Sequence, residues 1–86
     1  MAIKDKVVIY TAGYCPYCVA AKDLLDSKEI AYKEIHTSKN DAAWKEMEKL
    51  SGNNTVPQIF INNMAIGGFD DLALLDSNNE LSKLLN

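Results

Sequence analysis

The only cysteines of this 86-residue chain, Cys15 and Cys18, stand three positions apart in the stretch YTAGYCPYCVAAK. A disulfide between them would close a very small loop, and such a loop restrains the unfolded chain little. Small secreted domains instead carry several disulfides that join distant segments. The pair is therefore better suited to thiol chemistry than to stabilising a fold.

The position of the pair predicts two thiols of different reactivity. The apolar run VVIY, residues 7–10, predicts a buried strand, and Pro16 is typical of a first helical turn. Cys15 then precedes a helix whose free N–H groups favour negative charge, so its thiol should ionise more readily than a free one. Cys18 should be more enclosed. We expect Cys15 to be a thiolate nucleophile and Cys18 a resolving thiol, with Lys22 adding a weak positive potential.

A C-x-x-C pair could also be half of a zinc site. Structural zinc takes four ligands, whereas this chain has two cysteines and a single histidine, His36. Two inert thiols placed by coincidence are disfavoured by their position after a strand in a strand–helix–strand pattern. Redox exchange is the stronger interpretation, no metal site is expected, and His36 is expected at the surface.

Composition argues for a soluble intracellular protein. Apolar residues make up 48% and charged residues 24%, and the net charge is -3 with no arginine. Phosphate binding relies on concentrated positive charge, so neither nucleic acid nor an anionic membrane is an expected partner. The start, MAIKDKVVIY, lacks the long apolar core of a secretory signal, and no stretch approaches the roughly 20 apolar residues that cross a bilayer. We expect a cytoplasmic protein.

Hydrophobic spacing predicts the elements that would carry the pair. A helix from Pro16 is indicated by apolar residues at helical intervals: Val19, Ala20, Leu24 and Leu25. Residues 31–37 alternate as a half-buried strand. Ser38 or Asn40 offers an N-cap for a second helix, which should end near Gly52. Its expected core face consists of Trp44, Met47 and Leu50.

The C-terminal third predicts a hairpin followed by a helix. Asn62-Asn63 separates two short apolar strands, and asparagine tolerates the positive φ of a two-residue turn. Asp70 and Asp71 open a third helix, and Ser77 with Glu80 resembles a capping box for a last helical turn. The order βαβαββα predicts a single α/β domain over residues 1–86, with a four-stranded mixed sheet flanked by helices. Sites in such sheets form beyond the carboxyl ends of strands, where Cys15 lies.

Three segments in this order resemble the dithiol glutaredoxins: CPYC at 15–18, TVP at 55–57 and GGFDD at 67–71. The resemblance covers essentially the whole chain and is greatest to short bacterial-type members. It implies a thioredoxin-like fold and a glutathione-dependent thiol–disulfide oxidoreductase. Such an enzyme reduces protein disulfides and glutathione mixed disulfides with glutathione as co-substrate, acts as a monomer, and counts ribonucleotide reductase among its partners.

The resemblance also implies roles for individual residues. Cys15 would be the nucleophile and Cys18 the resolving thiol. Tyr17 would flank bound glutathione, and the Val56 backbone would pair with its cysteinyl part beside a cis Pro57. The segment 68–71 would hold the γ-glutamyl end, although Asp71 is equally suited to cap the helix. The implied binding residues are Tyr17, Thr55, Val56, Pro57, Gly68, Phe69, Asp70 and Asp71.

Three positions depart from the glutaredoxin pattern. Ala12 stands where many members have a lysine, and Asn54 where many have an arginine. Each missing cation should weaken carboxylate binding by about 1–3 kcal/mol. Lys45 or Lys49 on the second helix could compensate, although solvated surface lysines are the favoured interpretation of both. Tyr14, where a small polar residue is common, could contact a ligand or shield Cys15.

Two other functions remain compatible with the pattern. The same fold could be reduced by thioredoxin reductase, and the missing cations at positions 12 and 54 leave room for that donor. Alternatively, two chains and two glutathiones could share a [2Fe–2S] cluster through Cys15. Related cluster carriers usually have glycine after the first cysteine and serine in place of the second, so Pro16 and Cys18 argue against this role.

Overall fold

The computed structural model describes residues 6–85, so residues 1–5 and 86 of the predicted domain lie outside the described residues. Its elements follow in the order β1 (Val7–Thr11), α1 (Pro16–Ser27), β2 (Lys33–His36), α2 (Asp41–Ser51), β3 (Gln58–Ile61), β4 (Met64–Gly67), α3 (Phe69–Ser77) and α4 (Glu80–Leu85). The predicted order βαβαββα is confirmed, and the expected last helical turn is the separate short helix α4.

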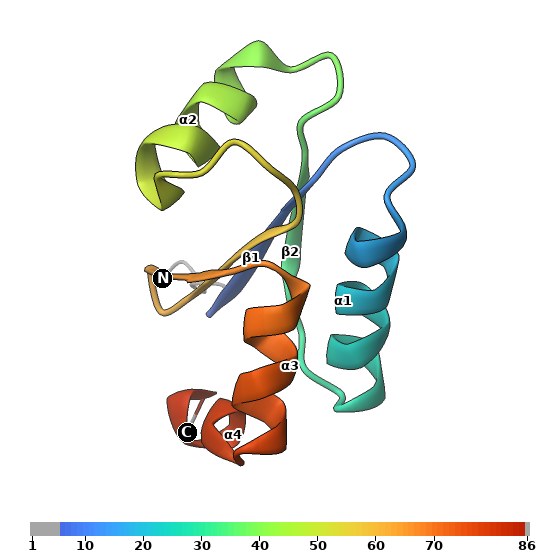
Figure 1. Ribbon diagram of the computed structural model, residues 1–86, viewed down its shortest axis with the longest axis vertical. Coiled ribbons are helices and arrows are strands. Elements are labelled where there is room, and N and C mark those ends of the chain that lie inside the picture. Colours follow the sequence, from blue (N-terminus) through green and yellow to red (C-terminus); the bar gives the residue numbers. More distant parts are fainter. Residues whose placement is uncertain (1–5, 86) are drawn as a thin grey trace, which may run out of the picture.

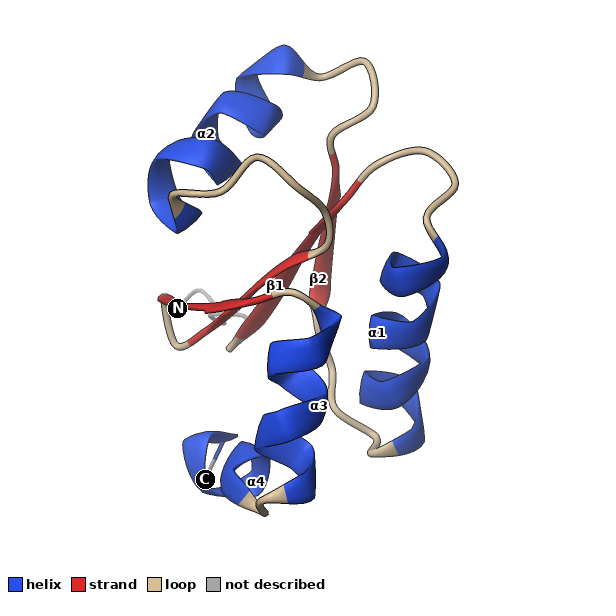
Figure 2. Cartoon of the chain, viewed as in Figure 1, coloured by secondary structure: helices blue, strands red, loops and turns tan. Residues whose placement is uncertain are grey.

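The strands form one mixed sheet in the order β2-β1-β3-β4. β1 pairs with β2 in parallel, while the β1–β3 and β3–β4 pairs are antiparallel. Figure 1 shows α1 and α3 on one side of this sheet and α2 on the other, and Figure 2 shows the same layers by element type. The four-stranded sheet flanked by helices is thus as predicted.

Alternating side chains of the central strands divide the core into two layers. Val7 and Ile9 of β1 pack with residues of β3, α1 and α3 on one face. Tyr10 and Phe60 pack with Met47 of α2 on the other face. The rings of Tyr10 and Phe60 meet edge to face with centroids 5.6 Å apart. Since both faces are covered, β1 is held firmly and its C-terminal end is a rigid base for the loop that carries Cys15.

The predicted core faces of two helices need correction. Val19 and Leu50 were expected to be buried, yet they are 45% and 54% exposed. On α1 the buried positions are Cys18, Ala21 and Leu25, and on α2 they are Ala43 and Met47. Leu25 and Met47 of the expected faces are fully buried, and the small residues Ala21 and Ala43 also face the core. Trp44 is half-buried against the second core layer, as expected of a packing residue.

Local signals for the ends of elements were mostly correct. Asn40 caps α2 through a hydrogen bond from the Ala43 N–H to Oδ1 (3.1 Å), and Gly52 ends it with φ 75°. Asn62 and Asn63 have positive φ in the hairpin turn. The predicted capping box at Ser77 is wrong. Ser77 is the last residue of α3, and its hydroxyl donates to the Leu74 carbonyl (3.0 Å).

The strand predicted over residues 31–37 is shorter than expected, since β2 covers only Lys33–His36. Ser38, the second N-cap candidate, has another role: its Oγ accepts a hydrogen bond from the Gly13 N–H. This bond ties the loop after β1 to the loop after β2. Within the described part of the chain, no helix has the length and apolar character needed to cross a membrane.

Candidate functional site

Cys15 occupies the N-cap of α1, directly beyond the carboxyl end of β1. Its backbone is extended, with φ -142°, so the side chain folds back over the first helical turn. The Cys18 N–H donates a hydrogen bond to Cys15 Sγ at 3.3 Å. Cys15 Sγ also lies 3.9 Å from the Val56 carbonyl oxygen, and both thiols are free. A donor at the helix N-terminus therefore points at this sulfur, which is the arrangement that stabilises a thiolate.

Cys18 has a contrasting environment. It is only 3% exposed, and burial raises the pKa of its thiol from 9.0 to about 12. The hydrogen bond with Cys15 acts in the same direction, whereas a backbone hydrogen bond with Ala12 and the charge of Lys22 oppose it. At neutral pH Cys18 therefore holds its proton. The enclosed environment predicted for Cys18 is confirmed, and the positive potential of Lys22 reaches this buried thiol.

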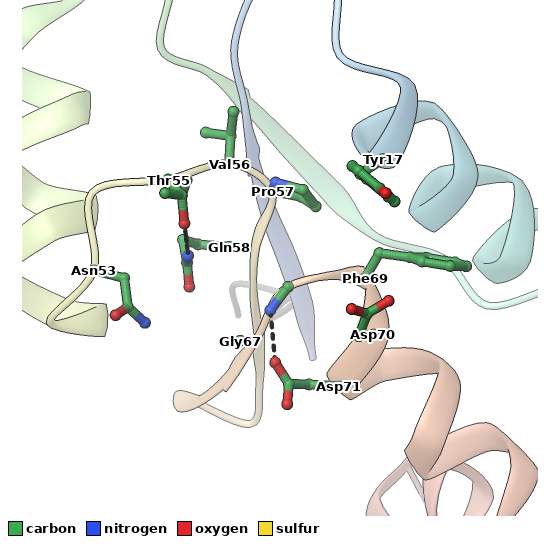
Figure 3. Close-up of a pocket in the computed structure, with 11 residues that line it drawn as sticks. Tyr17, Asn53, Thr55, Val56, Pro57, Gln58, Gly67, Phe69, Asp70 and Asp71 are labelled. Atoms are coloured by element: carbon green, nitrogen blue, oxygen red, sulfur yellow. Dashed lines mark hydrogen bonds between the residues drawn. The ribbon is translucent and has the colours of Figure 1, made fainter.

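A pocket of about 330 Å³ (Figure 3) is lined by Tyr17, which stands between the two cysteines in sequence, and by Val56, whose carbonyl oxygen lies 3.9 Å from Cys15 Sγ; neither cysteine is itself in the lining. Every residue that the resemblance assigned to glutathione lines it, together with Asn53, Gln58 and Gly67, which the sequence reasoning missed. Gln58 could have been suspected, because it is a polar residue at the start of an otherwise apolar strand. Gly67 is the first residue of the GGFDD motif, although the binding role was assigned only from Gly68 onward, whereas Asn53 carried no comparable signal. The lining combines α1, the loop before β3, and the β4–α3 junction.

The loop before β3 forms one wall of the pocket. The Val56–Pro57 peptide bond is cis, as the resemblance implied. Gln58 is 3% exposed, and its Nε2 donates to the Thr55 carbonyl (2.9 Å) and to Thr55 Oγ1 (3.2 Å). Figure 3 shows the Gln58 amide turned back toward Thr55. The buried amide thus holds this loop in place opposite Cys15.

Two aromatic rings form the next part of the wall. The ring of Tyr17 in α1 and the ring of Phe69 in α3 have centroids 6.4 Å apart and planes tilted by 32°. Figure 3 shows the two rings close to each other. Tyr17 remains 62% exposed. Flat apolar faces placed at the rim of a pocket suit the aliphatic parts of a bound peptide.

The β4–α3 junction supplies the polar end of the pocket. The Gly68 N–H donates to Asp71 Oδ2 at 3.1 Å, so the capping role considered for Asp71 is present. Gly67 has φ 120°, and a Cβ atom there would collide with the Asp71 carboxylate. Asp70 is exposed and lines the pocket. This end therefore presents a helix N-terminus next to two carboxylates.

Several candidate residues lie away from the pocket lining. Tyr14 is 90% exposed, and Ala12, Asn54, Lys45 and Lys49 are likewise outside the lining. No basic side chain is found among the described residues that surround the pocket. The lysines of α2 are exposed, and His36 is exposed at the end of β2, as expected.

One further polar cluster lies behind Cys18. Lys22 Nζ is 3.1 Å from Glu34 Oε2, and the buried Thr11 hydroxyl donates to the same oxygen at 2.7 Å. The hydrogen bond from Thr11 and the charge of Lys22 lower the pKa of Glu34, against the effect of burial. Among residues 6–85, no three His, Cys, Asp or Glu side chains are arranged to hold a metal ion.

A cysteine at a helix N-terminus, with a buried second thiol one helical turn later, on a four-stranded mixed sheet flanked by helices, is the arrangement of a thiol–disulfide oxidoreductase. The family model for glutaredoxin matches residues 7–66. The chain belongs to the glutaredoxin family.

Individual relatives agree with this assignment. Glutaredoxin 1 of Rickettsia typhi is 49% identical over 86 residues, covering 98% of this chain and 83% of the relative. Glutaredoxin 3 of Escherichia coli K12 is 51% identical over 79 residues, covering 92% of this chain and 95% of the relative.

Solved structures agree as well. The solution structure of glutaredoxin from Brucella melitensis has a TM-score of 0.81 at 44% identity, covering 94% of this chain and 88% of that one. A buckwheat glutaredoxin–glutathione complex has a TM-score of 0.85 at 28% identity, covering 94% of this chain and 76% of the buckwheat chain.

Proposed function

We propose that this protein uses glutathione to reduce protein disulfides and glutathione mixed disulfides. The observation that carries the proposal is the position of the pocket. The Val56 carbonyl, which belongs to the lining, lies 3.9 Å from Cys15 Sγ, so a tripeptide bound there would place its sulfur beside Cys15. A glutathione complex is known for the buckwheat relative.

In the proposed single-cysteine route, the Cys15 thiolate attacks the glutathionyl sulfur of a mixed disulfide. A bond forms between Cys15 Sγ and that sulfur, and the partner protein leaves as a thiolate that takes up a proton. A second glutathione thiolate then attacks the glutathionyl sulfur and releases Cys15, giving glutathione disulfide. The hydrogen bond from the Cys18 N–H supports both the attacking and the leaving state of Cys15.

In the proposed two-cysteine route, Cys15 attacks a protein disulfide and Cys18 resolves the resulting mixed disulfide. The intramolecular disulfide that forms is then reduced by two glutathione molecules. Cys18 is buried and its backbone N–H lies 3.3 Å from Cys15 Sγ, so the sulfur within its reach is Cys15 Sγ itself, which it attacks once a substrate sulfur is bonded there. This arrangement keeps Cys18 from reacting with other thiols and disulfides.

The pocket suggests how glutathione is oriented. Tyr17 and Phe69 would cover its aliphatic parts, and the Val56 backbone would pair with its cysteinyl unit. The N-terminus of α3 at Gly68 and Phe69 would bind the γ-glutamyl carboxylate, with Asp70 and Asp71 near the amino group. Thr55 and Pro57 would shape the loop that faces this ligand.

The expected setting is the cytoplasm, where glutathione keeps thiols reduced. Glutathionylated or disulfide-containing proteins, ribonucleotide reductase among them, are the proposed partners of a monomeric enzyme.

The test compares Cys15→Ser and Cys18→Ser with the unaltered protein in a glutathione-coupled assay on a mixed-disulfide substrate. We expect Cys15→Ser to abolish turnover and Cys18→Ser to retain it, because the single-cysteine route needs only Cys15. Activity of Cys15→Ser would show that the assigned roles are wrong.

A second electron donor is suggested by the lack of basic residues in the described lining. Because glutathione carries two carboxylates, such a pocket gives it little charge complementarity, and thioredoxin reductase could serve instead. Rates measured with each donor system separately distinguish the two. Reduction by thioredoxin reductase alone would overturn the choice of glutathione.

A further inference from the structure

The cluster of Thr11, Lys22 and Glu34 joins three elements next to the buried thiol. Glu34 lies on β2 beside Ile9 of β1, and its Oε2 accepts from both the Thr11 hydroxyl and Lys22 Nζ. The side chains of Lys22 and Glu34 are 28% and 32% exposed, so the pair lies at the surface and is only partly shielded from water. Such shared contacts hold the Lys22 ammonium in one place.

Lys22 lies four residues after Cys18 in α1, and residues at this spacing are neighbours on one helix face. The charges that act on the Cys18 thiol are those of Cys15 and Lys22, while Glu34 is not among them. Lys22 is therefore the member of the pair whose charge favours the Cys18 thiolate. The hydrogen bond to Glu34 is the largest cause of the raised pKa of Lys22, and the charge of Cys18 acts in the same direction.

We propose that Lys22, positioned by Glu34, stabilises the Cys18 thiolate in the step that resolves a mixed disulfide on Cys15. In this step Cys18 loses its proton to solvent and its sulfur attacks Cys15 Sγ. The Cys15–Cys18 bond forms, the bond from Cys15 to the substrate sulfur breaks, and the substrate leaves as a thiolate. Two electrons pass from the two cysteines to the substrate disulfide over the whole exchange.

The need for such a cation follows from the burial of Cys18. A thiol enclosed by apolar residues ionises with difficulty, and Cys18 is 3% exposed with a raised pKa. The attacking sulfur must nevertheless carry negative charge in the transition state. Lys22 is a fixed positive charge that reaches this site without opening it to water. The inference rests on the proposed two-cysteine route.

The step can be followed with an aromatic disulfide reagent whose thiolate absorbs visible light. Attack by Cys15 releases one aromatic thiolate, and attack by Cys18 on the mixed disulfide releases a second. We expect Lys22→Gln to slow the second release by about three- to fivefold, the effect of losing roughly 1 kcal/mol of charge interaction. Lys22→Arg should restore it, since the charge returns, and Lys22→Met is a second neutral variant.

Lys28→Gln is the matched control. Lys28, at the other end of α1, is also paired with a carboxylate, Asp76 Oδ1 at 2.9 Å. We expect this variant to release both thiolates at the rates of the unaltered protein. Equal slowing by Lys22→Gln and Lys28→Gln would point to a general effect of α1 stability and overturn the proposal. Unchanged release in Lys22→Gln and Lys22→Met would also overturn it.

Glu34→Ala tests the positioning role separately. Without the carboxylate, the Lys22 side chain is free to turn toward solvent, so the second release should slow, though less than in Lys22→Gln. Faster release would mean that Glu34 only cancels the charge of Lys22. If the unaltered protein gives the first release but no second, the two-cysteine route fails instead. If it gives neither, the proposed role of Cys15 fails.

Discussion

The backbone N–H of Cys18 donates a hydrogen bond to Cys15 Sγ over 3.3 Å, while the thiol of Cys18 itself is buried. One residue thus stabilises negative charge on its neighbour and withholds its own sulfur from solvent. The two thiols of one short motif therefore differ in burial and in the groups around them, and this difference leads to direct predictions.

Alkylation should distinguish the cysteines. At neutral pH we expect iodoacetamide to modify Cys15 and to leave Cys18 unmodified, because Cys18 is 3% exposed and the pKa of its thiol is raised to about 12. Peptide mass spectrometry after timed quenching measures the extent of alkylation at each cysteine. In urea the two sites should react to similar extents. Modification of Cys18 before Cys15 in the folded protein would contradict the structure.

Alkaline pH should reduce the free energy of unfolding through Cys18. Its pKa in the folded protein lies above the ordinary value of 9.0, so the folded state binds the proton more tightly than the unfolded state. The resulting stability is fully present below pH 9.0 and is lost as the pH rises toward about 12. Tyr10 and Tyr32 also have raised pKa values and contribute in the same direction.

Cys18→Ala isolates this contribution, because both tyrosines are retained. Urea unfolding of the two proteins across the alkaline range should show the stability advantage of the unaltered protein shrinking as pH rises. A constant difference at every pH would mean that Cys18 ionises as easily in the folded as in the unfolded chain.

Gly67 should be intolerant of any side chain. Its φ of 120° is strained for other residues, and a Cβ atom would collide with the Asp71 carboxylate. We expect Gly67→Ala to lower the free energy of unfolding by about 1–3 kcal/mol. Gly68→Ala is the control, since its Cβ would meet only the Pro57 carbonyl oxygen at 3.6 Å, an ordinary contact. Equal destabilisation by both changes would refute the explanation.

Restoring a cation should strengthen glutathione binding, if the pocket holds glutathione. Ala12→Lys and Asn54→Arg introduce the charges found in many members of the family. We expect each to lower the Kd of glutathione for the Cys15→Ser protein, which cannot form the mixed disulfide, by about fivefold, or roughly 1 kcal/mol. Lys45→Gln should leave it unchanged, because Lys45 is exposed and outside the pocket lining. Titration calorimetry measures the Kd of all three variants. The affinity gained from each added cation should decrease as salt is added, because salt screens the attraction between charges.

Much of the fold could be predicted from local pattern. The strands, the αL residue Gly52 and the Asn62-Asn63 turn were correctly anticipated, because side-chain periodicity and allowed φ values are properties of short segments. The helix faces were less accurate. Val19 and Leu50 are apolar at plausible spacing, yet tertiary packing turns other residues of α1 and α2 inward.

The candidate site was predicted by motif and completed by packing. The family's motifs located most residues of the pocket, but the sequence did not show that the Gln58 amide bonds to the Thr55 loop, or that Lys22 pairs with Glu34. Ser77 was assigned to the wrong helix, since its hydroxyl can bond to either neighbouring turn. Such contacts depend on which segments meet in space.

The sequence by itself determined which atoms could react: two sulfurs three positions apart, at the junction of a strand and a helix. Only the tertiary structure decided how they differ. Burial of Cys18 in α1, partial exposure of Cys15 at the helix end, and a lysine of α1 paired with a carboxylate of β2 all arise from tertiary packing. Desolvation and fixed charge act over distances in space, and local spacing along a chain does not encode those distances.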